Sequence, residues 1–397
     1  MSDNSAYDWK HLEASAENPI WITSAEQLSE CCEKWRNLPL IALDTEFQRV
    51  DTFYPLPGLI QVADDQACYL IDPLEISDFS SLSTLFKDEG VVKVMHAATE
   101  DLELFHKEIG ALPVPLFDTQ IAAALINWGF SMGLQRMLES CLSVQLEKHE
   151  TTSNWLQRPL TSSQEKYAAL DVAYLPAIYE IQRQELLSRG HFHWVEQECS
   201  AMLADAAIDD VDGFSYYTRF TQMWRLPKHK LAALRDLTAW REQQARKRNV
   251  PRNRILRNQA ILQIIEQWPK GLADLSRLDE IKKSILRTDG EVILGFLKGG
   301  EASADKVEPE PIPQPLHYFW NKHLKKLKAI ARRLAEENNT APEMLLRRKE
   351  LEQLIRSGVD EGEYRLPQAM SAWRKEMLDA ALMDELQRIE KLRVQGS

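Results

Sequence analysis

Two carboxylates lie two residues apart at the end of an apolar run, in "LPLIALDTEF" (38–47). The apolar residues before them predict a buried strand. Side chains alternate across a strand, so Asp44 and Glu46 are expected on the same face. Two ionised carboxylates at close range raise the pKa of one of them, and a bound cation removes that cost. Grouped oxygen ligands suit Mg²⁺ or Mn²⁺, although two solvated acids at a strand end would give the same pattern.

A second acid is predicted to point inward from a helix. The segment "TEDLELFHKEIG" (99–110) predicts a helix with Thr99 as N-cap and Gly110 at its end. Asp101 shares its face with apolar residues three and four positions later, so we expect it to face the core. Stabilisation by the helix dipole is the alternative explanation for an acid in a first turn.

A third segment, "YAALD" (167–171), places Tyr167 and Asp171 four residues apart on one helical face. A core tyrosine beside a paired aspartate is the alternative reading. The helix is predicted to open with a capping box formed by Thr161 and Gln164. Pro176 is expected to kink it.

Hydrophobic patterning predicts a mixed α/β domain over residues 18–200. A hairpin is expected at 58–72 and a strand at 91–98. The N-terminus lacks the form of a secretion signal, and the apolar runs are too short for a membrane span. Five scattered cysteines without metal-type spacing fit a reducing cytosol, so we expect a cytoplasmic protein with no membrane partner.

Two all-helical domains are predicted after residue 208, at 210–298 and 314–395, joined by a Pro-rich linker at 300–313. The blocks 240–265 and 331–355 share the pattern helix, Asn-containing turn, Pro, helix. A duplicated helical module is the simplest account of this similarity.

Charge divides unevenly between the two halves. Residues 1–200 hold 31 acids and 13 Lys/Arg, net −18, whereas residues 201–397 hold 29 acids and 35 Lys/Arg, net +6. Such asymmetry is typical of a catalytic body joined to a part that binds polyanions, although basic solvent faces are also common without a ligand. A candidate phosphate-binding patch lies around one turn and consists of Arg246, Lys247, Arg248, Arg252 and Arg254.

The three acidic segments together carry a family resemblance. "LDTEF", "HAATEDLELF" and "YAALDVAYL" resemble the exonuclease motifs of the DEDD superfamily, tyrosine subtype. Lys166, five residues before Asp171, stands where the histidine subtype would have His. "IALDTEFQR", "YPLPGLIQ" and "WLQRPLTSSQEKYAALDVAYL" are similar to bacterial ribonuclease D, and the helical blocks resemble its HRDC modules. The resemblance implies an α/β ribonuclease H-like domain, a mixed sheet flanked by helices, followed by two small helical bundles.

The resemblance also implies roles for the acidic residues. Asp44, Glu46, Asp101 and Asp171 would hold two divalent cations, Mg²⁺ or Mn²⁺, and Tyr167 would orient the attacking water. Two metals can activate water, neutralise phosphate oxygens and stabilise the leaving group. A neutral tyrosine can hydrogen-bond the water without adding another charge.

Other polar residues are weaker candidates. By resemblance, Gln61 contacts the terminal nucleotide, but a place in the hairpin explains it equally well. His96 could stack on a nucleotide or be satisfied at a strand end. Asp118 matches a recurrent family position, but N-capping of a helix accounts for it. Asp72 is expected to be a turn acid.

The substrate is RNA rather than DNA by resemblance only. The family implies a 3′→5′ exoribonuclease acting on tRNA precursors with 3′ extensions, releasing nucleoside 5′-monophosphates, and no protein partner is indicated. Two alternatives stay open: a 3′→5′ DNA exonuclease of the same fold, and a non-catalytic nucleic-acid-binding scaffold.

Overall fold

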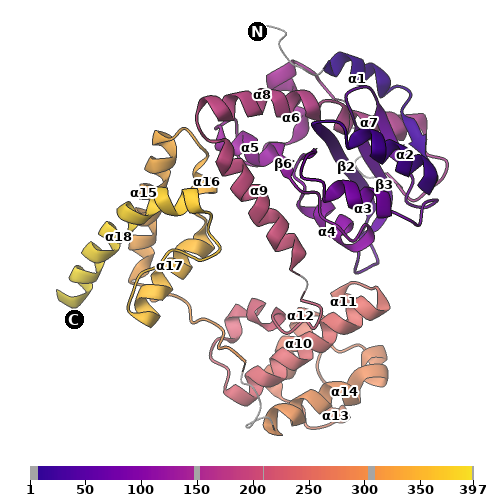
Figure 1. Ribbon diagram of the computed structural model, residues 1–397. Helices are drawn as coiled ribbons and strands as arrows, with labels where there is room; N and C mark the ends of the chain where they lie inside the picture. Colours follow the sequence, from indigo (N-terminus) through magenta and orange to yellow (C-terminus); the bar gives the residue numbers. More distant parts are fainter. Residues whose placement is uncertain (1–7, 147–152, 209, 303–308, 396–397) are drawn as a thin grey trace. The chain divides into compact units, whose positions relative to one another are not determined.

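The computed structural model describes residues 8–146, 153–208, 210–302 and 309–395. The chain divides into two compact units (Figure 1). The first combines the chain up to Gln48 with residues 57–207 and everything from Leu316 onwards, and the second combines Arg49–Leu56 with Ile208–Pro315. In the described ranges, every helix is too short or too polar to cross a bilayer.

A six-stranded mixed sheet forms the centre of the first unit. Its strand order is β1-β4-β3-β2-β5-β6. The pairs β1/β4, β2/β5 and β5/β6 are parallel, and β3/β4 is antiparallel. The strands are β1 Ile20–Ile22, β2 Leu40–Gln48, β3 Leu56–Ala63, β4 Cys68–Ile71, β5 Val92–Met95 and β6 Leu116–Asp118.

Helices cover the sheet and bury its central strands. Helices α7 and α8 both pack against β2, and α9 packs against β6. The helices are α1 Trp9–Ser15, α2 Ala25–Trp35, α3 Ser80–Phe86, α4 Thr99–Glu108, α5 Thr119–Leu125, α6 Leu134–Leu142, α7 Ser162–Ala173, α8 Leu175–Ser188 and α9 Phe192–Ala207.

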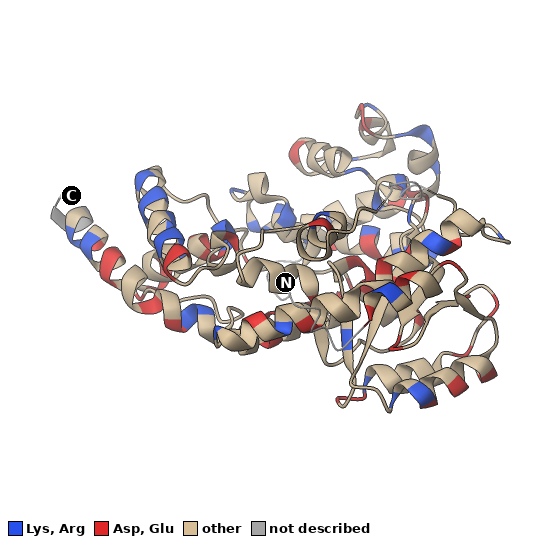
Figure 2. Cartoon of the chain, turned by 90° about the horizontal axis from the view of Figure 1, so that it is seen from above, with Lys and Arg blue, Asp and Glu red and all other residues tan. Residues whose placement is uncertain are grey.

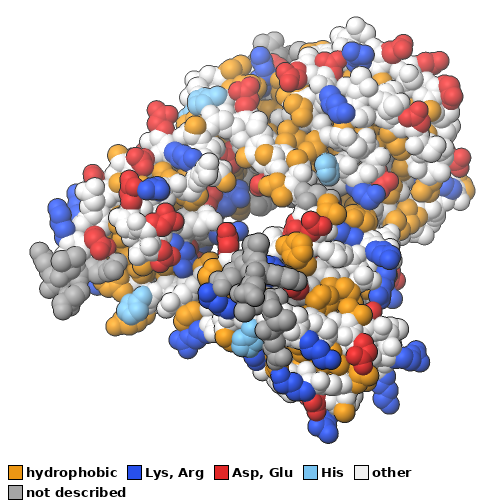
Figure 3. Space-filling view, turned by 60° about the horizontal axis from the view of Figure 1, so that its bottom comes forward, with side chains coloured by type: hydrophobic (Ala, Val, Ile, Leu, Met, Phe, Trp, Pro, Cys, Tyr) orange, Lys and Arg blue, Asp and Glu red, His pale blue; other side chains and the backbone are white. Residues whose placement is uncertain are grey.

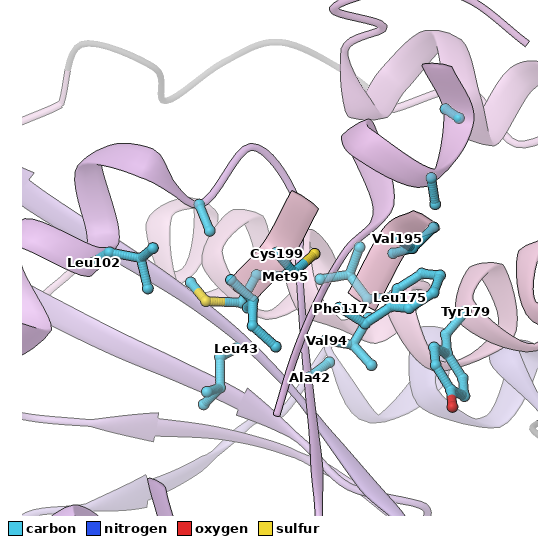
Figure 4. Close-up of a cluster of buried hydrophobic side chains, with 14 of the residues drawn as sticks. Ala42, Leu43, Val94, Met95, Leu102, Phe117, Leu175, Tyr179, Val195 and Cys199 are labelled. Carbon is cyan, nitrogen blue, oxygen red and sulfur yellow. The ribbon is translucent and has the colours of Figure 1, made fainter. Parts of the chain in front are cut away.

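The core explains why β2 reads as a continuous apolar run rather than an alternating one. Residues 40–43 are all buried, as expected of a strand covered on both faces. Figure 4 shows Ala42 and Leu43 of β2 beside Val94 and Met95 of β5, with side chains from β6, α4, α8 and α9 around them. The run therefore ends in Asp44 at the point where the strand leaves this core.

Several local predictions are confirmed. Strands β3 and β4 form the predicted antiparallel hairpin. Thr161 and Gln164 form both halves of the capping box at the start of α7. The long helix is broken at Tyr174, and Pro176 stands in the first turn of the helix that follows.

The predicted N-cap residue of α4 is wrong. Thr99 is the first helical residue, and Ala98 occupies the N-cap position without a side-chain hydrogen bond. Ala97 adopts a left-handed conformation (φ 58°), which ends the strand before the predicted residue 98. The Asp118 carboxylate accepts a hydrogen bond from the backbone N–H of Ala98 at 2.9 Å, so an acid distant in sequence stabilises this turn.

The C-terminal helical module belongs to the first unit. It contains α15 Trp320–Glu337, α16 Pro342–Leu345, α17 Arg348–Glu361 and α18 Ala372–Gln395. Trp373 stacks on Trp194 of α9 with ring centroids 4.3 Å apart. The Glu198 carboxylate accepts hydrogen bonds from Trp373 Nε1 (2.9 Å) and Ser371 Oγ (2.6 Å). This module is thus packed onto the sheet domain through apolar and buried polar contacts.

The second unit is helical and also holds the β2–β3 connection. Its elements are η1 Tyr216–Arg219, η2 Thr221–Met223, α10 Lys228–Arg248, α11 Arg252–Ile255, α12 Asn258–Gln267, α13 Leu272–Leu275 and α14 Lys283–Ala302. Asn249 ends α10 with φ 46°, and Asn339 has φ 49° after α15. Each is followed by a proline, a one-turn helix and a longer helix, so both helical modules contain the pattern expected of a duplication.

Asn249 also binds the β2–β3 connection within the second unit. Its Oδ1 accepts hydrogen bonds from the backbone N–H groups of Phe53 and Tyr54, both at 3.1 Å.

We predict that Asp64 is a stability determinant of the sheet domain. Its carboxylate is fully buried in the hairpin turn and accepts from Lys34 Nζ (2.6 Å), Tyr69 Oη (2.8 Å) and the indole of Trp35 (3.2 Å). Asp64→Ala should lower the unfolding free energy by about 2–4 kcal/mol, because it leaves buried donors unpaired. Urea denaturation followed by circular dichroism measures this loss. Asp65→Ala, at an exposed neighbour, should stay within about 0.5 kcal/mol of wild type, and equal losses in the two variants would contradict the assignment.

Candidate active site

Strand β2 presents its two acids to one partly exposed face. Asp44 and Glu46 are half-buried, whereas Leu43 and Thr45 on either side of Asp44 are buried. The predicted alternation is therefore observed. The charge of Glu46 contributes to raising the pKa of Asp44.

Helix α4 contributes Asp101 from its first turn. The side chain is only 7% exposed, as its position on the apolar face predicts. The Thr45 hydroxyl donates a short hydrogen bond to the Asp101 carboxylate. Asp101 also interacts electrostatically with Asp44 and Glu46, so the acids of α4 and β2 face a common space.

Helix α7 contributes Tyr167 and Asp171 and packs against β2. The Tyr167 hydroxyl interacts with the Asp171 carboxyl, and this interaction lowers the pKa of Asp171 against the larger effect of burial. Burial, followed by the negative charges of Asp171, Glu46 and Asp44, raises the pKa of Tyr167, so the phenol stays neutral. The structure thus brings together the five residues that the sequence motifs single out.

Burial is the main cause of the raised pKa values of these acids. It raises the pKa of Asp44 well above its usual range, that of Glu46 to about 8, and those of Asp101 and Asp171 to about 7. Across the described residues, none of the four forms a salt bridge with Lys or Arg. Acids buried without a counter-charge are costly unless they are protonated or bind a cation.

The donor set fits a hard divalent cation. Four carboxylates supply only oxygen ligands, and a cation would make their crowding favourable. In the ranges that the structure covers, no three acidic, His or Cys side chains are already arranged as a ligand cage. The four carboxylates repel one another, which gives a physical reason why they share a space without converging on a single metal position.

Gln61 and His96 lie in the same domain and differ in exposure: Gln61 is buried, whereas His96 is half-buried. Gln61 is fully buried in β3, and neither atom of its amide has a hydrogen-bond partner among the described residues. His96 Nδ1 is 2.8 Å from Thr119 Oγ1, and burial lowers the pKa of the imidazole. Asp118 caps α5 by accepting from Gln120 and Ile121, as expected.

The basic residues of α10 and α11 are largely engaged within the second unit. Arg252 forms a salt bridge with Glu242 at 2.7 Å, Arg248 pairs with Asp289 at 3.0 Å, and Arg254 pairs with Asp51. Arg246 approaches the Tyr54 hydroxyl at 3.3 Å. Lys247 is exposed and lacks such a partner among the described side chains.

Charge on the helical modules is mixed rather than uniformly basic. On the C-terminal module, i,i+4 pairs such as Arg332–Glu336 and Arg348–Glu352 neutralise part of the basic charge. Basic and acidic residues both occur along the helix that leads to the C-terminus (Figure 2). In the view of Figure 3, Lys and Arg side chains are spread among hydrophobic and neutral groups rather than gathered in one continuous patch. On this face the positive charge is therefore dispersed among other side chains.

One neighbour of the acids had no role in the sequence interpretation. Thr45 stands between the two acids of β2 and bonds Asp101 of α4. Its only signal was its position inside "DTE", since a buried threonine in a strand is ordinary. The partner that makes it part of the site lies 56 residues away.

Comparisons with known proteins match both the domains and the whole chain. A family model described as 3′-5′ exonuclease matches residues 19–187, one described as HRDC domain matches 230–297, and one described as ribonuclease D, C-terminal HRDC domain matches 319–382. The chain is 41% identical over 367 residues to ribonuclease D of Pseudomonas paraeruginosa, covering 92% of this chain and 97% of that protein. It is 34% identical over 368 residues to ribonuclease D of Escherichia coli, covering 92% and 98%.

A solved structure agrees with these relatives. The crystal structure of Escherichia coli RNase D, described as an exoribonuclease involved in structured RNA processing, matches with a TM-score of 0.87 at 33% identity. The match covers 94% of this chain and 99% of that one. Similarity of this extent, over the sheet domain and both helical modules, shows that the chain belongs to the ribonuclease D family.

Proposed function

We propose that this chain is a metal-dependent 3′→5′ exoribonuclease that uses Asp44, Glu46, Asp101 and Asp171 as metal ligands and Tyr167 to orient the attacking water. Membership of the ribonuclease D family carries the exoribonuclease activity. The family generally uses divalent metal ions. One observation of this structure carries the assignment of residues. Four acids from three separate segments, Asp101 buried and the other three half-buried, share a space, and among the described residues none of them forms a salt bridge with Lys or Arg.

Each residue of the site has a distinct task in this proposal. The four carboxylates hold two divalent cations, Mg²⁺ or Mn²⁺, which when bound supply positive charge for the phosphate oxygens and lower the pKa of water. Tyr167 stays neutral, so its hydroxyl can hydrogen-bond a water beside Asp171 without adding a negative charge. Thr45 holds the Asp101 carboxylate toward the other acids.

The proposed substrate is a structured RNA precursor with a single-stranded 3′ extension, chiefly that of tRNA. The site needs the terminal nucleotide separated from any duplex, since its acids lie inside a folded domain. The helical modules supply sequence-tolerant attraction to the RNA backbone. Gln61, His96 and the basic residues of α10 and α11 stay proposed substrate contacts, and Lys247 is the member of the basic set best placed to meet a phosphate.

Asp101→Asn should abolish turnover while RNA binding remains. Replacing a charged ligand by a neutral amide weakens cation binding, and we expect kcat to fall by roughly 10³-fold or more. Asp44→Asn and Asp171→Asn should behave alike. Gel-shift assays with chelator should give an RNA Kd within about twofold of wild type, because this affinity comes mainly from phosphate contacts outside the acid cluster.

The matched control is Glu100→Gln, which removes an exposed acid from the same turn of α4. It should retain wild-type kcat, because Glu100 is exposed to solvent and is not among the proposed ligands. Equal loss of activity in the Glu100 and Asp101 variants would show that charge on the helix, rather than metal ligation, controls the rate.

Metal-free protein should lose stability as pH rises. The folded pKa values of Glu46, Asp101 and Asp171 are raised to about 7–8, above the value of about 4 for unfolded carboxyls. The native state therefore holds extra protons, and the stability they confer is present below about pH 4 and lost as pH rises through about 8. Thermal melts in chelator should show Tm falling between pH 5 and pH 8.

Mn²⁺ should raise Tm more at pH 8 than at pH 6, because ligands must lose their protons to bind it. Asp101→Asn should flatten both dependences. A metal-free Tm that is constant from pH 5 to pH 8 would contradict the raised pKa values.

Product analysis tests polarity and substrate together. We expect 5′-labelled tRNA precursor to shorten stepwise from its 3′ end with Mg²⁺ or Mn²⁺, releasing nucleoside 5′-monophosphates, and to remain intact with chelator. A single-stranded DNA of matched sequence should be digested more slowly. Faster digestion of DNA would favour the DNA exonuclease alternative, and no metal-dependent digestion of either would favour a binding scaffold.

A further inference from the structure

One arginine joins the loop before α7 to the sheet. Arg158 donates from Nε and Nη2 to the two carboxylate oxygens of Asp72, at 2.6 Å each. Asp72 follows β4 and is only 3% exposed. It also accepts from the backbone of Leu74, as a turn acid does, so the predicted turn role is only part of its function. A bidentate pair with a buried acid fixes both distance and direction.

The remaining donors of Arg158 reach backbone carbonyls of strand β3 and of the loop itself. Nη2 also donates to Gly58 O of β3 at 2.6 Å, and Nη1 donates to Trp155 O (3.1 Å) and Gln157 O (2.7 Å). One guanidinium therefore ties two strands of the sheet to two carbonyls of the loop. Its planar geometry dictates the shape of that loop.

The loop in turn packs against the proposed water-orienting tyrosine. Trp155 is 2% exposed, and its ring centroid lies 6.1 Å from that of Tyr167. Gly58 permits this approach: a Cβ there would lie 2.7 Å from Trp155 Cβ and 3.0 Å from Glu46 O. Loop, β3 and β2 are thus in close contact beside the acids.

Further hydrogen bonds connect the loop to elements that carry site residues. Gln48, at the end of β2, donates from Nε2 to Asn154 Oδ1 at 2.8 Å. Gln157 donates from Nε2 to Gln164 Oε1 at 2.9 Å, and Gln164 belongs to the capping box of α7. The loop therefore spans from the strand of Asp44 to the helix of Tyr167.

We propose that Arg158 is a positioning residue for hydrolysis: by fixing residues 153–160 it sets Trp155 against Tyr167 and so fixes the tyrosine hydroxyl relative to the acids. The inference rests on the role proposed above for Tyr167. Arg158 acts through that residue, because its donors are engaged by Asp72 and by backbone carbonyls. Arg158→Lys keeps the charge but loses the planar fork, so the loop gains freedom while the fold is retained.

A double-mutant cycle in the full-length protein tests the inference. Single-turnover and steady-state cleavage of a 3′-tailed single-stranded RNA are measured for wild type, Arg158→Lys, Tyr167→Phe and the double variant. Arg158→Lys should lower kcat by about 10-fold with KM within about twofold, because substrate affinity comes from other contacts. In the Tyr167→Phe background the same change should lower kcat by less than about twofold, since the group it positions is gone.

Two further variants separate positioning from general stability. Arg36→Lys alters an ion pair of the same unit, with Asp88 at 3.1 Å, and should leave kcat unchanged. Gly58→Ala introduces a Cβ that would lie 2.7 Å from Trp155 Cβ and so displaces the same loop from the side of the sheet. It should reproduce the loss of kcat and the dependence of that loss on Tyr167. This second variant tests the inference even if Arg158→Lys folds poorly.

Equal factors of loss with and without the Tyr167 hydroxyl, or wild-type kcat in Arg158→Lys, would overturn the inference while leaving the proposed function intact. Wild-type kcat in Tyr167→Phe would instead overturn the role of Tyr167 and the inference with it. A wild-type protein that cleaves no RNA would overturn the proposed function itself.

Discussion

Electrostatic repulsion among four carboxylates, one buried and three half-buried, is the constraint on which the rest of this structure depends. Such a cluster persists only if a rigid framework prevents the acids from turning out to water. The sheet provides that framework, because β2 lies between β3 and β5 and its apolar residues are buried. Helices α4 and α7 then bring Asp101 and Asp171 to the same strand end. The core is therefore also the support of the site.

In the part of the chain that the structure describes, hydroxyl groups rather than cationic side chains interact with the acids. Thr45 donates a hydrogen bond to Asp101, and Tyr167 interacts with Asp171; each interaction lowers the pKa of its carboxyl against the larger effect of burial. A lysine or arginine in either place would neutralise the acid permanently. Hydroxyl donors orient the carboxylates and leave their charge available to a divalent ion. The same domain does use arginine where the acid is structural, as between Arg158 and Asp72.

The acid cluster could be predicted from sequence because its pattern is local. Alternation in β2, the inward face of α4 and the i,i+4 spacing in α7 each follow from the geometry of a single element. Contacts between segments that are distant in sequence could not be predicted in this way. The cap of α4 depends on Asp118, and Thr45 acts on a residue 56 positions away. The basic turn of α10 and α11 looked free in sequence because Glu242 and Asp289, which pair with Arg252 and Arg248, are brought there only by folding.

Trp373 of the C-terminal module stacks on Trp194, and its indole donates a hydrogen bond to Glu198. The module therefore also protects residues of the sheet domain from water. It covers part of the surface of the sheet domain. A chain shortened before Leu316 would uncover an indole ring and a carboxylate that the full protein keeps from water. Solubility, rather than affinity for nucleic acid, would be the first property of such a fragment to change.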